Sequence, residues 1–196
     1  MTPRSYNLGK RAQSKEQTRS RIIDAALALH NEKGVVATTI QDIASRADVA
    51  LHTVYRYFPT INDAVAGCGQ LVMQQLAPPG PQIFASVDGL EARVRVLVVE
   101  LFAMYARGAR QIEVMRCQQA EVPALAEAVE GLDRHHKMLV GEALRGFTSR
   151  AQDQREVSAM TDFYVWKAFA DRDTSRQRTA ELITAVVLAH LTNART

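Results

Sequence analysis

Apolar residues recur along this chain mainly at the spacing of an α-helix, and no segment shows the alternation typical of a half-buried strand. Near the N-terminus, Ile22, Ala26 and Leu29 fall on one face of a helix that is predicted to start at Ser14. Gly34 is expected to end this helix, because glycine adopts the left-handed conformation after a last turn at little cost. The pattern as a whole predicts an all-α protein.

A short second helix is predicted next, with two alternative starts. Thr38 and Gln41 match the capping-box pattern, and Thr39 and Asp42 offer a near-equivalent one residue later. Each alternative places a hydroxyl where it can accept a hydrogen bond from a backbone N–H group of the first turn. The apolar face of this helix consists of Ile40, Ile43, Ala44 and Ala47.

A third helix is predicted from Leu51 to Phe58, after a connection at residues 47–50, and Pro59 stops it. The side chains expected to point inward from the two short helices are Ile40, Ile43, Ala44, Val49, Val54 and Phe58. Those expected to point outward from the third helix are Leu51, His52, Thr53, Tyr55 and Arg56. Two short helices joined by a tight turn are the pattern of the helix-turn-helix, whose second helix enters the major groove of DNA.

The outward side chains have chemistry suited to DNA. Arginine can bind guanine or phosphate, threonine and histidine can bond to base edges, leucine can meet a thymine methyl, and tyrosine can bond to phosphates. Thr39 stands at a helix N-terminus, where backbone N–H groups favour an anion. We therefore predict DNA contacts from Lys15, Arg19, Thr39, Leu51, His52, Thr53, Tyr55, Arg56 and Tyr57. The alternative is structural, because many proteins that do not bind DNA contain two short helices with a turn, and Tyr55 and Tyr57 can be packing residues.

Charge is distributed unevenly along the chain. Residues 1–60 hold nine Lys and Arg against five Asp and Glu, whereas residues 61–196 hold fifteen against sixteen. A positive N-terminal third favours a polyanionic partner, although an ordinary solvated surface would also explain it. Residues 1–13 are predicted to form a flexible basic arm, and the nearby cluster of Lys10, Arg11, Lys15 and Arg19 can attract the DNA backbone or enter a minor groove.

A run within residues 19–66 resembles the DNA-binding head of TetR-family transcription regulators. The motifs are EKG at 32–34, TT-x-x-x-IA at 38–44 and T-x-Y-x-YF at 53–58, in the order and spacing of the family. The resemblance implies a helix-turn-helix domain at 14–60, followed at 61–196 by a helical bundle that binds an effector and dimerises. The implied function is that of a repressor that binds a palindromic operator as a homodimer and is released by a small molecule.

The sequence departs from the family pattern around the third helix. Asp48 stands where the family usually has Gly, Ala50 where it favours Ser, and His52 where it often has Gly. Alanine cannot cap a helix with its side chain, which should cost ~1 kcal/mol of helix stability. His52 adds bulk and a hydrogen-bond donor at the DNA face, so the preferred operator can differ from those of relatives.

The remainder of the chain is predicted to be helical up to residue 193. The expected helices are 62–76, a long helix capped by Asp88, 110–119, 122–149, 154–170 and 175–193. The last two are apolar on more than one face and must be buried on more than one side. Burial within the chain is one explanation, and the family resemblance implies pairing with a second copy. The predicted dimer interface consists of Phe163, Trp166, Leu182, Val186, Ala189 and His190.

The family resemblance also implies an effector pocket between the middle helices. The candidates for its lining are Phe102, Met104, Tyr105, Glu113, Cys117, His136 and Trp166. His136 stands on an otherwise apolar stripe, and a buried imidazole requires hydrogen-bond partners. It can equally be a core histidine whose bonds are satisfied within the protein, and the other candidates can be plain core residues.

Other classes of function have little support in the sequence. An all-helical enzyme or carrier is the main alternative, but no motif of a serine hydrolase, zinc protease, dinucleotide-binding protein or P-loop protein occurs. His135 and His136 are adjacent and diverge on a helix, so we expect no metal or cofactor. A redox sensor using Cys68 and Cys117 would need a reactive, exposed thiol. The start of the chain has no secretory apolar segment, which leads us to expect a cytoplasmic protein.

Overall fold

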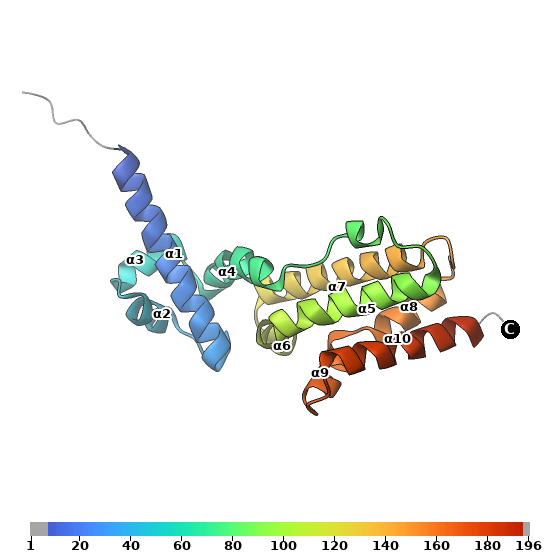
Figure 1. Ribbon diagram of the computed structural model, residues 1–196. Helices are drawn as coiled ribbons and strands as arrows, with labels where there is room; N and C mark the ends of the chain where they lie inside the picture. Colours follow the sequence, from blue (N-terminus) through green and yellow to red (C-terminus); the bar gives the residue numbers. More distant parts are fainter. Residues whose placement is uncertain (1–7, 194–196) are drawn as a thin grey trace, which may run out of the picture. The chain divides into compact units, whose positions relative to one another are not determined.

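The computed structural model describes residues 8–193, and all regular elements in this range are helices (Figure 1). They are α1 (Leu8–Lys33), α2 (Ile40–Ala47), α3 (Leu51–Tyr57), α4 (Ile61–Leu76), the 3-10 helix η1 (Pro81–Phe84), α5 (Leu90–Arg107), α6 (Ala109–Gln118), α7 (Pro123–Leu144), α8 (Ala151–Met160), α9 (Phe163–Ala170) and α10 (Arg176–Asn193). The predicted all-α class is confirmed. Between residues 8 and 193, no helix combines the length and the apolar composition that a membrane span requires.

The first helix begins earlier than the hydrophobic pattern indicated. α1 starts at Leu8, so residues 8–13 are helical although they were predicted to be part of a flexible arm. The pattern failed here because a helix can begin among polar residues with good helix propensity, such as those at 10–13, without an apolar face to reveal it. Residues 1–7 of the predicted arm lie outside the described range.

The segment 154–170, predicted as one helix, belongs to two helices, α8 and α9. Asp162 lies between them in an extended conformation, and its carboxylate accepts a hydrogen bond from the Tyr164 backbone N–H at 2.8 Å. Aspartate is a preferred residue for this capping position, so a new helix starts there. α7 also ends earlier than predicted, at Leu144, and Gly146 follows it with a positive φ of 82°.

Internal contacts divide the chain into two units, which are described separately. The first unit holds the described residues up to Leu71 together with Glu113–Ala128, and the second holds Val72–Ile112 together with the residues from Val129 onward. The core of the first unit includes Ile22, Ile23, Ala26, Leu29, Ile43, Ala44, Val54, Phe58, Ala64 and Cys68. The helix-turn-helix pattern therefore packs its apolar sides together, as its spacing indicated.

α2 starts at the second of the two predicted positions. The Thr39 hydroxyl accepts a hydrogen bond from the Asp42 backbone N–H at 3.1 Å, and the Thr39 N–H donates to the Asp42 carboxylate at 2.9 Å. Lys33 adds an ion pair to the same carboxylate at 2.8 Å. The hydrogen bond from Lys33, followed by those from Thr39, holds the pKa of Asp42 well below its usual range. Asp42 therefore stays negative in the first turn of α2, where a negative charge is favourable.

The turn between α2 and α3 requires a left-handed residue and is tied to α1. Asp48 follows α2 with a φ of 51° and a ψ of 55°, a conformation that glycine adopts more easily than aspartate. Arg21 of α1 donates through Nη2 to the backbone carbonyls of Ala47 and Asp48, both at 2.9 Å. These bonds fix the turn, and with it the start of α3, against α1.

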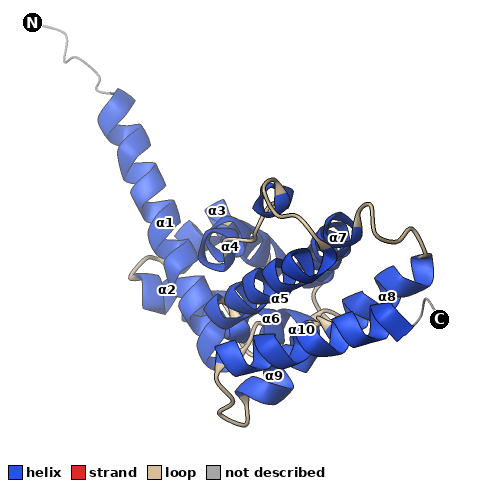
Figure 2. Cartoon of the chain, turned by 45° about the vertical axis from the view of Figure 1, so that its right-hand side comes forward, coloured by secondary structure: helices blue, strands red, loops and turns tan. Residues whose placement is uncertain are grey.

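In the second unit, α5 lies between α7 and α10 (Figures 1 and 2). The side chains that are almost completely buried in this unit include Val94, Leu97, Val98, Leu101, Phe102, Leu139, Val140, Ala143, Leu144 and Val187. Most of them come from α5 and α7, and Val187 comes from α10. This arrangement leaves the opposite side of α10 outside the core.

Arg93 of α5 binds several backbone carbonyls at once. Its guanidinium donates to the carbonyls of Phe84 and Val87, both at 3.3 Å, to that of Ala143 at 3.2 Å and to that of Glu142. It also lies over the Phe84 ring, 5.0 Å from the ring centre. Carbonyls at the end of a helix such as α7 lack partners within that helix, so one arginine satisfies several otherwise unpaired acceptors.

The left-handed conformation of Asp48 predicts the effect of two substitutions. Asp48→Gly should raise the free energy of unfolding by up to about 1 kcal/mol, and Asp48→Val should lower it by about 1–2 kcal/mol, because branching at Cβ is strained at positive φ. Urea denaturation followed by circular dichroism measures both. A valine variant as stable as the parent would contradict this account of the turn.

The contacts of Arg93 predict a large loss of stability on its removal. Arg93→Met should lower the free energy of unfolding by about 2 kcal/mol or more, because buried carbonyls lose a charged donor. Arg95→Met is the matched control, since Arg95 makes a surface ion pair with Glu91 at 3.0 Å that is worth about 0–1 kcal/mol. Equal losses in the two variants, measured by urea denaturation, would show that the carbonyl contacts contribute little.

Candidate nucleic-acid interface

α3 presents one face to the core of the first unit and the other to solvent. Val54 is fully buried, whereas Tyr55 is 49% exposed and Leu51 is 38% exposed. His52 and Arg56 are also exposed, and the predicted outward residue Thr53 is half-buried. The structure therefore offers a short rod with an apolar back and a polar, accessible front, which is the geometry that major-groove binding requires.

The start of α3 lacks a side-chain cap. Ala50 precedes the helix with extended backbone angles, φ −66° and ψ 143°, and cannot accept a hydrogen bond through its side chain. The absence of a side-chain cap is the consequence expected when alanine stands where the family favours serine. α3 depends on packing at its back and on the turn before it for its position.

Tyr57 is bonded to α1 and is only partly exposed. Its hydroxyl donates to the Lys15 backbone carbonyl at 3.1 Å, and its side chain is half-buried. The predicted phosphate contact from Tyr57 would require this bond to break. The guanidinium of its neighbour Arg56 lies 5.3 Å from the centre of the Tyr57 ring.

Two basic residues of α1 flank the end of α3. Lys15 is exposed, and Arg19 is half-buried, with its guanidinium 5.7 Å from the centre of the Phe58 ring. Arg19 also lies 3.8 Å from the Glu16 carboxylate. Positive charge therefore borders the exposed face of α3, as predicted. Of the other members of the predicted basic cluster, the side chains of Lys10 and Arg11 lie outside the described part of the structure.

The hydroxyl of Thr39 is engaged within the capping box. Besides accepting from the backbone of Asp42, it donates to the Asp42 carboxylate at 2.7 Å. It lies at the N-terminus of α2, where it was predicted, but its donor is already used by a negatively charged neighbour. A phosphate at this point would meet the Asp42 charge, and Lys33 is already paired with that carboxylate.

Contacts of the loop before α2 were not predicted from the sequence. The Gln118 side chain accepts hydrogen bonds from the backbone N–H groups of Val35 at 2.7 Å and Val36 at 3.2 Å. Gly34 packs against the same side chain with a φ of 84°, and a Cβ at this glycine would lie 2.5 Å from Gln118 Nε2. No sequence motif signals such a contact, because it joins residues more than eighty positions apart.

The residues proposed to line an effector pocket are distributed over both units. Phe102, Met104, Tyr105, His136 and Trp166 are buried in the second unit. Tyr105 lies 6.2 Å from Phe102 and 6.0 Å from Trp166, measured between ring centres, so three of the candidates form an aromatic cluster. Glu113 and Cys117 belong to the first unit, and Cys117 is exposed.

His136 has polar partners in the middle of this apolar region. Its Nε2 lies 2.8 Å from the Thr161 hydroxyl, and that hydroxyl donates to the Val157 carbonyl at 2.8 Å. Because a hydroxyl has a single proton, this pattern is consistent with donation from His136 Nε2 to the Thr161 oxygen. The Tyr105 hydroxyl bonds to the Thr161 carbonyl at 3.2 Å. His136 is thus the satisfied core histidine that the sequence analysis held open.

The predicted dimer residues separate into two groups. Phe163 and Trp166 are buried by their own chain, because they pack into the aromatic cluster with Tyr105, and so offer little surface to a partner. Leu182 and Val186 of α10 are 40% and 45% exposed, and Ala189 is also exposed. His190 is half-buried and lies beside Glu156. The exposed apolar residues therefore follow one face of α10.

The two cysteines differ in their surroundings. Cys68 is buried, and burial, followed by the charge of Asp24, raises the pKa of its thiol to about 12. A thiol with so high a pKa forms almost no thiolate at neutral pH and reacts slowly. Cys117 is exposed. Cys68 is therefore unsuited to redox sensing.

Comparison with known proteins bears on the first unit above all. Residues 22–63 match the family model of bacterial regulatory proteins of the tetR family. The transcriptional repressor KstR of Mycolicibacterium smegmatis is 47% identical over 53 residues, which are 27% of this chain and 25% of KstR. KstR of Rhodococcus jostii is 47% identical over 47 residues, 24% of this chain and 22% of the relative. The match thus spans about a quarter of these relatives or less.

Solved structures share the fold over most of the chain. A transcriptional regulator from Rhodococcus sp. Rha1 superposes with a TM-score of 0.66 at 17% identity, covering 88% of this chain and 96% of that one. The complex of SmeT with triclosan gives 0.62 at 21% identity, covering 89% and 91%. The multidrug binding protein EbrR, complexed with imidazole, gives 0.61 at 19% identity, covering 94% and 96%. The chain thus matches the tetR family of bacterial regulatory proteins over residues 22–63, and it shares its fold with these solved structures over most of its length.

Proposed function

We propose that this protein is a sequence-specific DNA-binding transcriptional repressor of the bacterial cytoplasm. The observation that carries the proposal is the orientation of α3, which buries Val54 and exposes Leu51, Tyr55 and Arg56. α3 also lies within residues 22–63, which match the family model of bacterial regulatory proteins of the tetR family. In this reading residues 14–60 bind DNA, and residues 61–196 bind an effector and dimerise.

The proposed division of labour on DNA follows from the geometry of α3 and α1. Arg56 and His52 contact base edges in the major groove, because both are exposed on α3 and can form directional hydrogen bonds. Leu51 contacts a thymine methyl, and Tyr55 contacts the backbone. Lys15 and Arg19 supply attraction for phosphates that does not depend on sequence. Tyr57 positions Arg56 and needs no DNA contact of its own.

A homodimer is proposed from the exposed face of α10. Leu182, Val186 and Ala189 are spaced as i, i+4 and i+7, so they form one apolar stripe on a helix whose other side is buried. Self-association through this stripe would remove it from water. A twofold axis then repeats α3, which predicts a palindromic operator with half-sites ~34 Å apart or a multiple of that distance.

The effector is proposed to be a small, largely apolar molecule. Phe102, Tyr105 and Trp166 offer aromatic surface in the second unit, and His136 and Tyr105 both bond to Thr161. The structures of SmeT with triclosan and of EbrR with imidazole contain small ring compounds on the same fold. A ligand that binds better to the conformation unable to fit DNA would release the operator by that difference in affinity.

Removal of the Arg56 side chain tests the proposed role of α3. After selection of a palindromic site from a random library, Arg56→Ala should bind that site about 10- to 100-fold more weakly and lose selectivity at the contacted base. Arg134→Ala removes the same charge from an exposed position on α7 and should bind normally. Fluorescence anisotropy at two salt concentrations measures both. Unchanged affinity and selectivity in Arg56→Ala would overturn the proposed role of α3.

A charge placed in the apolar stripe on α10 tests the proposed dimer. Val186→Glu should produce a monomer in light scattering and weaken binding to the palindromic site, because a charge would be buried in the dimer interface. Val99→Glu is the matched control, since Val99 is 44% exposed on α5 and lies outside the stripe. A Val186→Glu protein that remains dimeric would place the interface elsewhere.

A further inference from the structure

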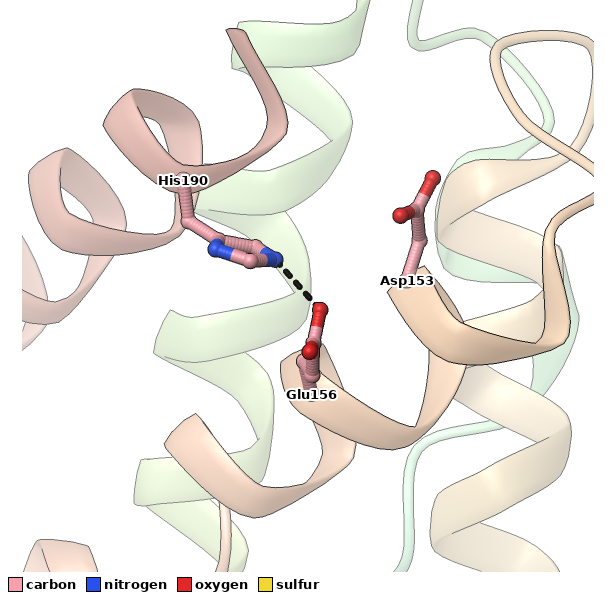
Figure 3. A group of neighbouring side chains, drawn as sticks. All are labelled: Asp153, Glu156 and His190. Atoms are coloured by element: carbon pink, nitrogen blue, oxygen red, sulfur yellow. Dashed lines mark ion pairs between the residues drawn. The ribbon is translucent and has the colours of Figure 1, made fainter. Parts of the chain in front are cut away.

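Three side chains that commonly bind metal ions meet between α8 and α10 (Figure 3). Asp153 and Glu156 are three positions apart on α8 and therefore share one side of that helix. His190 reaches them from α10. One ligand atom from each residue lies within 4.8 Å of the other two. The cluster belongs to the second unit and takes no part in the proposed DNA contacts.

The position of the His190 imidazole is poorly explained by an ion pair alone. Its Nε2 lies 2.7 Å from Glu156 Oε2. This nitrogen is nevertheless buried without a well-aligned hydrogen bond to any described residue. A protonated imidazole at that distance would normally point its N–H at the oxygen. The His190 nitrogen and the Glu156 oxygen lie close together without such alignment. Two ligand atoms that share one cation have this arrangement.

The two carboxylates are held in place by further hydrogen bonds. Gln152 donates to Glu156 Oε1 at 3.0 Å, which leaves Oε2 on the side of His190. The Arg150 guanidinium donates to Asp153 Oδ1 at 2.7 Å, and the Thr148 hydroxyl donates to Asp153 Oδ2 at 2.5 Å. Outer partners of this kind orient carboxylate ligands in metal sites.

The same bonds keep both carboxylates ionised, as metal ligands must be. The hydrogen bond from Arg150, followed by that from Thr148, lowers the pKa of Asp153 below its usual value. The hydrogen bond from Gln152 is the main cause that lowers the pKa of Glu156. Because each carboxylate oxygen has two lone pairs, Asp153 can bind a cation while it still accepts from Arg150 and Thr148.

We propose that His190, Glu156 and Asp153 form a binding site for a divalent transition-metal ion such as Zn²⁺. One imidazole with carboxylate oxygens suits Zn²⁺ and its neighbours in the first transition row, whereas Mg²⁺ and Ca²⁺ prefer oxygen ligands throughout. Tetrahedral Zn²⁺ with ligands at ~2.0–2.1 Å places neighbouring ligand atoms about 3.3 Å apart. His190 and Glu156 are near that separation, and an Asp153 oxygen lies within 4.8 Å of both. Water would complete the coordination.

This site was not predicted from the sequence, which led us to expect no metal. The only local signal is the pair of acidic residues on α8, and such pairs are common on solvated helices. His190 is 34 positions beyond Glu156 and becomes a neighbour only when α10 packs beside α8. The adjacent pair His135 and His136, which the sequence analysis considered, takes no part.

Zinc titration of the full chain tests the proposal. The parent carries Cys117→Ser, because Cys117 is an exposed thiol that can bind Zn²⁺ by itself. Calorimetry should show one ion bound per chain, with affinity that falls as the pH is lowered, because protons compete with the ion for the ligand atoms. Mg²⁺ should not compete. The readout does not involve DNA, so it stays interpretable if the proposed repressor function fails.

Variants locate the ion. His190→Gln and Glu156→Gln should each lower Zn²⁺ affinity at least about tenfold. Their side chains are 32% and 37% exposed, so both variants should fold, and circular dichroism verifies this. His135→Gln, which alters another half-buried histidine, is the matched control and should bind Zn²⁺ as the parent does. Absence of saturable binding, or unchanged affinity in His190→Gln, would overturn the proposal.

Discussion

Burial of the back of α3 is the constraint on which the function of the first unit depends. α3 spans only Leu51–Tyr57, and a helix of that length is not stable by itself in water. Its start also lacks a side-chain cap, because Ala50 precedes it. Packing of Val54 in a core shared with α1 and α2 must therefore hold the helix. Whatever loosens that core also loosens the side chains that face outward.

Hydrogen bonds from α1 complete what packing begins. Arg21 fixes the turn before α3, and the Tyr57 hydroxyl fixes its last residue to the Lys15 carbonyl. Both ends of α3 are thus anchored by hydrogen bonds to the same long helix, α1. In the second unit Arg93 has a comparable part, since it joins the end of α7 and the segment before α5 through backbone acceptors. Side chains that bind several carbonyls position the irregular segments of both units.

Much of this could be predicted from the sequence, because the decisive signals are local. The spacing of Ile43, Ala44 and Val54 determines which sides of α2 and α3 are buried. Glycine at 34 marks a position where the backbone turns left-handed. Periodicity failed where a helix is polar, as at the start of α1, and where a capping residue interrupts an apolar run, as at Asp162.

Features that join distant parts of the sequence were out of reach. The sequence shows that Tyr57 and Phe163 are aromatic, but only the packing of α3 on α1 and of α9 on α5 decides that both are used internally. The satisfied state of His136 likewise depends on Thr161, 25 positions away. The cluster of Asp153, Glu156 and His190 belongs to the same class.

The bonds that tie α3 to α1 end on backbone carbonyls, including those of residues 15 and 47. A main-chain acceptor is present whatever side chain a residue carries. Position 15 can therefore change its identity without releasing Tyr57, and the solvent-facing residues of α3 can change without disturbing Arg21. Specificity for a new operator can therefore evolve by exchange of a few surface side chains of α3. The hydrogen bonds of Tyr57 and Arg21 that hold the helix do not depend on those side chains.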